Sequence, residues 1–162
     1  FFSTIIKGGG GGGQLRYRHI TAEELHAEGV TFDLVVCSEV LEHVSDISLM
    51  MHDLCQLVRR SPEEASHVPG AGALYITTIN RTNLSYGLGI MAAENLMGLV
   101  PPGTHEWHKF VKPEELRTHL DHNHFDMHRT TGAFYNPLLD RWDGFPDTSV
   151  NYLVFSSPKT AT

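Results

Sequence analysis

The sequence is poor in cysteine, in positive charge and in long apolar runs. Its 162 residues include two cysteines, Cys37 and Cys55, which we interpret as buried thiols of a protein from a reducing compartment rather than as a disulfide. Twelve lysines and arginines against nineteen acidic residues give a net charge of −7, with no basic cluster, which argues against nucleic acid as a partner. No apolar stretch is long enough to predict a transmembrane helix.

Glycine is plentiful, yet the pattern of a phosphate-binding loop is missing. Gly8–Gly13 is an unbroken run of glycines, whereas a phosphate-binding loop needs spaced glycines between a strand and a helix. We therefore interpret residues 1–13 as a glycine-rich, flexible N-terminal segment. This segment has one lysine and no arginine and lacks the pattern of a signal or transit peptide. Residues 14–162 are long enough for a single domain with its own core.

The stretch FDLVVCSEVLEH, from Phe32 to His43, carries the clearest functional pattern. Its apolar run predicts a fully buried parallel strand over Phe32–Cys37, followed by a helix. Glu39, Glu42 and His43 have the spacing i, i+3, i+4 and can share one face of a helical turn. Because open α/β sheets place their sites at the carboxyl ends of strands, these side chains form a candidate active site. The same carboxylates are also typical of an ordinary helix N-terminus, where the helix dipole stabilises negative charge.

Strand and helix patterns alternate along the rest of the chain. Thr21 and Glu24 match a capping box, Asp46 or Ser45 can cap a second helix, and Pro113 begins another. The alternation, with two closing strands, predicts an α/β fold with a mostly parallel sheet and an antiparallel finish. We expect strands near residues 15–20, 32–37, 73–79, 127–135 and 150–156, and helices near 22–27, 46–58, 84–100 and 112–123.

Several blocks together resemble the ubiquinone-biosynthesis O-methyltransferases, which use S-adenosylmethionine (AdoMet) to methylate polyprenylated catechols. The blocks follow the order of that family. They are SEVLEHV (Ser38–Val44), ITTINRTNLSYGLGI (Ile76–Ile90), VPPGTHEWHKFVKPEEL (Val100–Leu116), YNP (Tyr135–Pro137) and VNY (Val150–Tyr152). The resemblance implies a class I (Rossmann-like) AdoMet methyltransferase sheet, mostly parallel with an antiparallel last strand. Residues 14–162 would then be the C-terminal two-thirds of a single methyltransferase domain.

The resemblance also implies roles for the residues after the buried strand. Ser38 would line the AdoMet site, and Glu39, Glu42 and His43 would bind Mg²⁺. A hard divalent cation with oxygen ligands lowers the pKa of a catechol hydroxyl, and the methyl group then moves in one displacement. His43 and Glu39 are the candidate catalytic residues, with His43 as general base because the pKa of an imidazole lies near working pH. Since Mg²⁺ prefers carboxylates and water, Glu39 and Glu42 are the better ligands.

The low-charge segment Leu84–Val100 predicts a helix that suits either a lid or the surface of a bilayer. The resemblance favours contact with a membrane-bound polyprenyl substrate through Tyr86, Met91 and Met97, and it makes His105 a further candidate for substrate contact. It implies a peripheral membrane protein with other ubiquinone-biosynthesis proteins as further partners. The place would be the matrix side of the mitochondrial inner membrane in a eukaryote, or the cytoplasmic face of the inner membrane in a bacterium.

The chain departs from the family pattern at two places. The loop between Val58 and Gly72 is longer than the family's short turn, which indicates a surface insertion. The family's first two strands, its glycine-rich AdoMet loop and its ribose-binding acidic residue would precede Gln14, and residues 1–13 do not supply them. In the family's strand order, 3-2-1-4-5-7-6, the missing strand 1 neighbours strand 4, here Phe32–Cys37. We therefore predict an unpaired apolar edge, and a poor domain unless a partner or a rearrangement covers that edge.

Other interpretations of the sequence stay open. The chain could be a truncated, non-catalytic homologue that binds partners in the ubiquinone-synthesis assembly, or a related methyltransferase with another small-molecule acceptor. His105, Glu106 and His108 could form a zinc site, although their spacing differs from that of a zinc-binding helix and the preceding Pro-Gly favours a loop.

Overall fold

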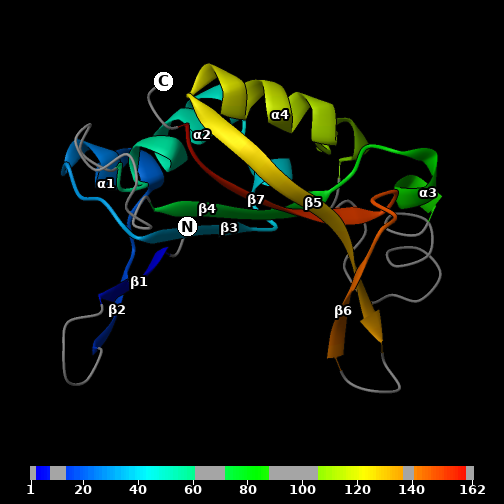
Figure 1. The fold of residues 1–162 in the computed structure, drawn as a ribbon, viewed down its shortest axis with the longest axis horizontal. Helices are drawn as coiled ribbons and strands as arrows, with labels where there is room; N and C mark the ends of the chain where they lie inside the picture. Colours follow the sequence, from blue (N-terminus) through cyan, green and yellow to red (C-terminus); the bar gives the residue numbers. More distant parts are fainter. Residues whose placement is uncertain (1–2, 8–13, 61–71, 88–105, 137–140, 160–162) are drawn as a thin grey trace.

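A five-stranded sheet forms the centre of the computed structural model, which describes residues 3–7, 14–60, 72–87, 106–136 and 141–159 (Figure 1). The strand order is β3-β4-β7-β5-β6. Since β3 and β4 are parallel and β7 runs antiparallel to both β4 and β5, the strands β3, β4 and β5 point the same way. The first four strands reproduce the order 4-5-7-6 that the family resemblance predicts. Their bounds are β3 Leu34–Ser38, β4 Ala73–Ile79, β7 Asn151–Pro158, β5 Phe125–Asn136 and β6 Arg141–Phe145.

Three helices lie on one side of this sheet (Figure 1). They are α1 (Ala22–Ala27), α2 (Ile47–Gln56) and α4 (Pro113–His122), all three close to the predicted ranges. Their ends follow local chemistry, since Thr21 and Glu24 form the predicted capping box and Asp46 accepts a hydrogen bond from the Leu49 N–H at 3.0 Å. The shorter turns are η1 (Leu41–His43), α3 (Asn83–Ser85) and η4 (Trp107–Lys109).

The hydrophobic core lies between the sheet and these helices. Every second residue of β4 and β7 points toward the helices and is buried, as strand geometry requires. The helices contribute their apolar sides in return. Core residues include Val35, Cys37, Leu74, Ile76, Tyr152 and Val154 from the strands, and Leu25, Met51, Leu54, Cys55, Leu116 and Leu120 from the helices.

The prediction that β3 is fully buried is wrong for one of its faces. Val35 and Cys37 are buried against the helices, but Leu34 and Val36 are 55% and 56% exposed. The register places Val36 beside Tyr75, and Tyr75 beside Phe155, which is also exposed. In the described part of the chain the helices cover only the other face of the sheet, and β3 lies at its edge as expected. An apolar run alone does not reveal which face a helix covers.

Two further elements differ from the sequence expectation. The predicted strand near residues 15–20 is β2 (Gln14–Arg18), which pairs with β1 (Ser3–Lys7) in a separate two-stranded antiparallel sheet instead of joining the central one. β6 lies where the sequence predicts a polar loop, and it pairs with the end of β5. β1 falls inside the segment 1–13 that is expected to be flexible. Gly8–Gly13, most of the insertion after Val58 and most of the expected helix 84–100 lie outside the described residues, so the domain boundary at residue 13 stays a prediction.

Candidate active site

The turn after β3 begins with Ser38 and Glu39, which lie beside the end of the neighbouring strand β4. Ser38 is exposed, and its hydroxyl lies 2.8 Å from that of Thr77. The backbone N–H of Glu39 donates to the carbonyl of Thr77 at 3.0 Å. Glu39 has a φ of 52°, in the left-handed region that a residue with a side chain rarely adopts. Such conformations concentrate at functional sites, which supports the interpretation of this turn as one.

The expected helical face of Glu39, Glu42 and His43 does not form. Glu39 lies outside any helix, and only Leu41–His43 form a single 3₁₀ turn, η1. Glu39 and His43 are exposed while Glu42 is buried. In the described part of the chain, the one group of three His, Cys, Asp or Glu ligand atoms within 4.8 Å of one another lies elsewhere, on α1 and α2. The left-handed backbone at Glu39 turns the chain before the helical spacing can apply.

Glu42 is the most unusual residue of this turn because its carboxylate is buried and only half paired. The side chain is 2% exposed, and its Oε2 accepts a hydrogen bond of 2.7 Å from the hydroxyl of Thr78 on β4. Its Oε1 is buried without a hydrogen-bond partner in the described part of the chain. Burying a carboxylate oxygen unpaired is unfavourable, so such an atom calls for a cation, a water molecule or a hydrogen-bond donor from a ligand.

The hydroxyls of Thr77 and Thr78 contact Ser38 and Glu42, and they are not among the residues predicted from the sequence. Both threonines lie near the end of β4, the strand parallel to β3. The rule that the carboxyl ends of adjacent parallel strands meet at one edge of a sheet could have identified them, because both segments carry polar residues at their ends.

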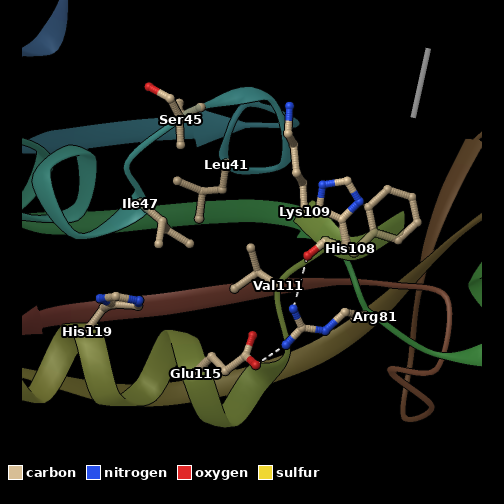
Figure 2. Close-up of a pocket in the computed structure, with 11 residues that line it drawn as sticks. Leu41, Ser45, Ile47, Arg81, His108, Lys109, Val111, Glu115 and His119 are labelled. Atoms are coloured by element: carbon tan, nitrogen blue, oxygen red, sulfur yellow. Dashed lines mark hydrogen bonds and ion pairs between the residues drawn. The ribbon is translucent and has the colours of Figure 1, made fainter. Parts of the chain in front are cut away.

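A pocket of about 330 Å³ lies next to this turn, between the start of α2 and helix α4 (Figure 2). Arg81 lines the pocket. Its guanidinium forms an ion pair with Glu115 and donates a hydrogen bond of 3.1 Å to the backbone carbonyl of His108. Partial burial lowers the pKa of His119, and the nearby His122 lowers it further by a smaller amount. Ser38, Glu39, Glu42, His43 and Tyr86 do not line the pocket. Its described lining consists of Leu41, Val44, Ser45, Ile47, Arg81, His108, Lys109, Phe110, Val111, Glu115 and His119.

Of the four predicted substrate-contact residues, Tyr86 is the one that the structure describes. Tyr86 is exposed, and its ring meets that of Trp107 edge to face at 6.2 Å. Met91, Met97 and His105 lie outside the described residues. No helix in the described ranges is long and apolar enough to cross a membrane.

The alternative zinc site of His105, Glu106 and His108 stays a prediction, because His105 lies outside the described residues. Glu106 pairs with Lys109 at 2.7 Å and lies 3.4 Å from the His108 ring nitrogen. These side chains do not belong to the group of converging ligand atoms in the described part of the chain.

Both cysteines are buried free thiols, as the sequence predicts. Burial raises the pKa of the Cys37 thiol to about 12, and the carboxylates of Glu42 and Glu39 add to the effect. Burial likewise raises the pKa of the Cys55 thiol to about 12, against a small opposing effect of Arg60. The reactive species of a cysteine is the thiolate, so both residues are core groups rather than nucleophiles.

Alkylation of these thiols should be slow and should respond to pH in a specific way. An ordinary thiol has a pKa near 8.5, so a pKa of about 12 lowers the thiolate fraction at pH 8 roughly a thousandfold. We expect the rate of iodoacetamide labelling of the folded chain to keep rising through pH 10, whereas the urea-unfolded chain should level off near pH 9. A plateau near pH 9 for the folded chain would show that the thiols are not buried in this way.

Comparisons with known proteins identify the class of this fold. A family model described as "Methyltransferase domain" matches residues 6–61. Among solved structures, a SAM-dependent methyltransferase from Thermotoga maritima, titled a possible histamine N-methyltransferase, superimposes with a TM-score of 0.51 at 12% identity. The match covers 81% of this chain and 57% of that one. The class I methyltransferase fold predicted from the sequence is therefore confirmed.

Curated relatives narrow the comparison to one family. The chain is 41% identical over 145 residues to a "Ubiquinone biosynthesis O-methyltransferase" of Rhizobium rhizogenes, covering 90% of this chain and 54% of that protein. It is also 41% identical over 144 residues to the "Ubiquinone biosynthesis O-methyltransferase, mitochondrial" of Homo sapiens, covering 88% of this chain and 36% of that protein. The resemblance that the sequence blocks indicate is thus confirmed along most of the chain. The chain spans about half the length of the bacterial relative and about a third of the human one.

Proposed function

From its similarity to ubiquinone-biosynthesis O-methyltransferases, we propose that the protein containing this chain transfers a methyl group from AdoMet to a hydroxyl of a polyprenylated catechol. The observation that carries the proposal is the turn after β3, where Glu42 is held buried with one oxygen unpaired. This turn lies at the carboxyl end of a strand, where α/β sheets place their reaction sites. The left-handed backbone of Glu39 on the same turn supports the same location.

We further propose that the finer roles follow the family resemblance. Ser38, exposed at the end of β3, would contact AdoMet. His43, also exposed, would be the general base that takes the proton of the catechol hydroxyl, with Glu39 as the second catalytic group. Holding the acceptor oxygen in line with the methyl carbon and sulfur would be the principal task of the surrounding residues.

Mg²⁺ is the metal that the resemblance implies, and Glu42 is the residue that fits it best. A hard cation prefers carboxylate oxygens, and the buried, unpartnered Oε1 of Glu42 is such an atom. The ligand atoms of Glu39, Glu42 and His43 do not all lie within 4.8 Å of one another, so we propose Glu42 as the principal ligand and the other two as additional ones. When bound, the cation would lower the pKa of the catechol hydroxyl.

The remaining proposals concern place and partners. The human relative is named as mitochondrial, and we propose the matrix side of the inner membrane for a eukaryotic source, or the cytoplasmic face of the inner membrane for a bacterial one. Contact with the bilayer surface would run through the segment that begins near Tyr86, which is exposed. Other ubiquinone-biosynthesis proteins are the proposed protein partners.

A chimera would test the proposed reaction. The part of the Rhizobium rhizogenes relative that precedes its match to this chain would be joined to residues 14–162 and checked for folding by circular dichroism. We expect the chimera to bind AdoMet and to transfer its methyl group to a short-tailed polyprenyl catechol, with no transfer to the matching monophenol. A folded chimera that fails to methylate the catechol, with or without binding AdoMet, would contradict the proposal and favour the non-catalytic alternative.

A further inference from the structure

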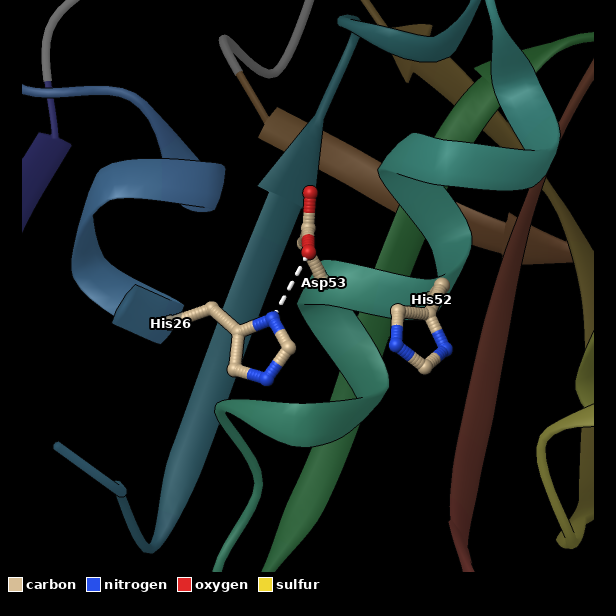
Figure 3. Close-up of side chains that lie close together, drawn as sticks. All are labelled: His26, His52 and Asp53. Carbon is tan, nitrogen blue, oxygen red and sulfur yellow. Dashed lines mark hydrogen bonds and ion pairs between the residues drawn. The ribbon is translucent and has the colours of Figure 1, made fainter. Parts of the chain in front are cut away.

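Three potential metal ligands converge between α1 and α2, away from the turn after β3. His26 lies in the last turn of α1, and His52 and Asp53 are neighbours on α2 (Figure 3). One ligand atom of each lies within 4.8 Å of the other two. The rings of the two histidines are 5.6 Å apart, edge to face. Two imidazoles and a carboxylate from two helices are a donor set that proteins use for transition metals.

The hydrogen bonds around His52 fix which of its ring nitrogens is free. The amide nitrogen of Asn123 donates to the carbonyl of His119 at 2.9 Å, which orients the amide. The Asn123 oxygen therefore faces the Nδ1 of His52 at 3.1 Å and accepts its proton. In a neutral ring with a protonated Nδ1, Nε2 carries the lone pair. A carbonyl that accepts the N–H proton of the ring nitrogen not bound to the metal is the usual support of a metal-binding histidine.

Asp53 has the position of an anionic ligand that a metal would compensate. Its carboxylate is 5% exposed, and its Oδ1 lies 2.8 Å from the Nδ1 of His26, so an ion bound by both atoms would replace the proton between them. The side chain of His26 is 39% exposed, so an ion has a path from solvent to a buried carboxylate. Buried carboxylates are stabilised by paired charges or by metals.

We propose that His26, His52 and Asp53 bind a divalent transition metal of the Zn²⁺ class, which would clamp the end of α1 to α2. Two nitrogens and one oxygen leave a fourth position for water, as in three-ligand zinc sites. Imidazole nitrogens select against Mg²⁺, so this site would be distinct in both place and preference from the carboxylate of Glu42. The proposal is independent of the methyltransferase function, because its three ligands come from α1 and α2 and not from the turn after β3.

Metal titration of the 162-residue chain tests the site. We expect Zn²⁺ to bind with a micromolar Kd by calorimetry and to raise Tm by several degrees, with no displacement by millimolar Mg²⁺. Co²⁺ should give the intense visible absorption of a tetrahedral centre. His52→Gln and His26→Gln should each weaken Zn²⁺ binding at least about tenfold. His128→Gln provides the matched control, because His128 lies on β5, bonded to Ser157 at 2.7 Å.

The outcomes separate a metal site from an ordinary hydrogen bond. If His26 and Asp53 only tie α1 to α2, the His26→Gln variant will lower Tm without metal, while the folded wild-type chain will show no specific Zn²⁺ binding. If His26→Gln, His52→Gln and the control all bind Zn²⁺ with the same affinity, the ion binds elsewhere, for example at others of the chain's eleven histidines. Either result would overturn the proposal, and neither depends on methyl transfer.

Discussion

Replacing Thr78 with valine should lower the free energy of unfolding by about 3 kcal/mol, although valine and threonine have nearly the same shape. The hydroxyl of Thr78 provides the hydrogen bond that the buried carboxylate of Glu42 accepts, and the other oxygen of that carboxylate has none in the described part of the chain. Removing it leaves a buried charged group without compensation, which costs more than an average hydrogen bond. Urea denaturation followed by circular dichroism measures the change.

The neighbouring threonine and a double variant serve as controls for this prediction. Thr77→Val removes a hydroxyl contact with exposed Ser38, which water can replace, so we expect a loss below about 1 kcal/mol. Combining Thr78→Val with Glu42→Leu should restore most of the stability, because both polar partners are then gone. Equal effects of Thr77→Val and Thr78→Val would show that Glu42 is not dependent on Thr78.

Phe125→Ala should destabilise the chain by about 3–5 kcal/mol, the range for truncating a buried aromatic ring. Phe125 begins β5, is fully buried in the layer between sheet and helices, and carries the guanidinium of Arg60 above its ring at 5.4 Å. The truncation leaves a cavity that surrounding side chains fill only in part.

The matched control for Phe125 is Phe145→Ala, on the neighbouring strand β6. Phe145 is 55% exposed, so its removal should change the free energy of unfolding by roughly 0.5 kcal/mol or less. Urea denaturation gives the free energy of unfolding of each variant. The two values can be compared if the slope of that free energy against urea concentration is the same for both. A loss of similar size for both would mean that the core does not extend to the start of β5 as described.

Local patterns predicted the regular elements of this fold well. The helix Ala22–Ala27 and the strand Ala73–Ile79 have the predicted bounds because a capping box and an apolar run between polar ends are signals within a few residues. β6 was missed because its glycine and its flanking proline read as loop, while the pairing with β5 that stabilises it joins distant segments. The exposed face of β3 was missed for the same reason, since burial depends on which helices cover the sheet.

The candidate site was located correctly along the chain, but its geometry could not be predicted. The motif SEVLEHV indicated the right turn, yet spacing alone assumed a helix where Glu39 adopts a left-handed backbone. That conformation is fixed by the hydrogen bond to Thr77 on another strand, which no local pattern contains. The burial of Glu42 and its bond to Thr78 are likewise products of the packing of η1 against β4.

The Mg²⁺ dependence of methyl transfer in the Glu42→Gln variant of the chimera tests whether the turn after β3 belongs to the reaction site. Glutamine keeps the shape of Glu42 and can still accept the hydrogen bond of Thr78, but it removes the charge that would hold the cation. We expect Mg²⁺ to activate the unchanged chimera. We expect the variant, with unchanged fold and AdoMet binding, to lose at least about 100-fold in kcat/KM. A variant with the wild-type rate and the wild-type Mg²⁺ response would show that Glu42 does not form part of the reaction site.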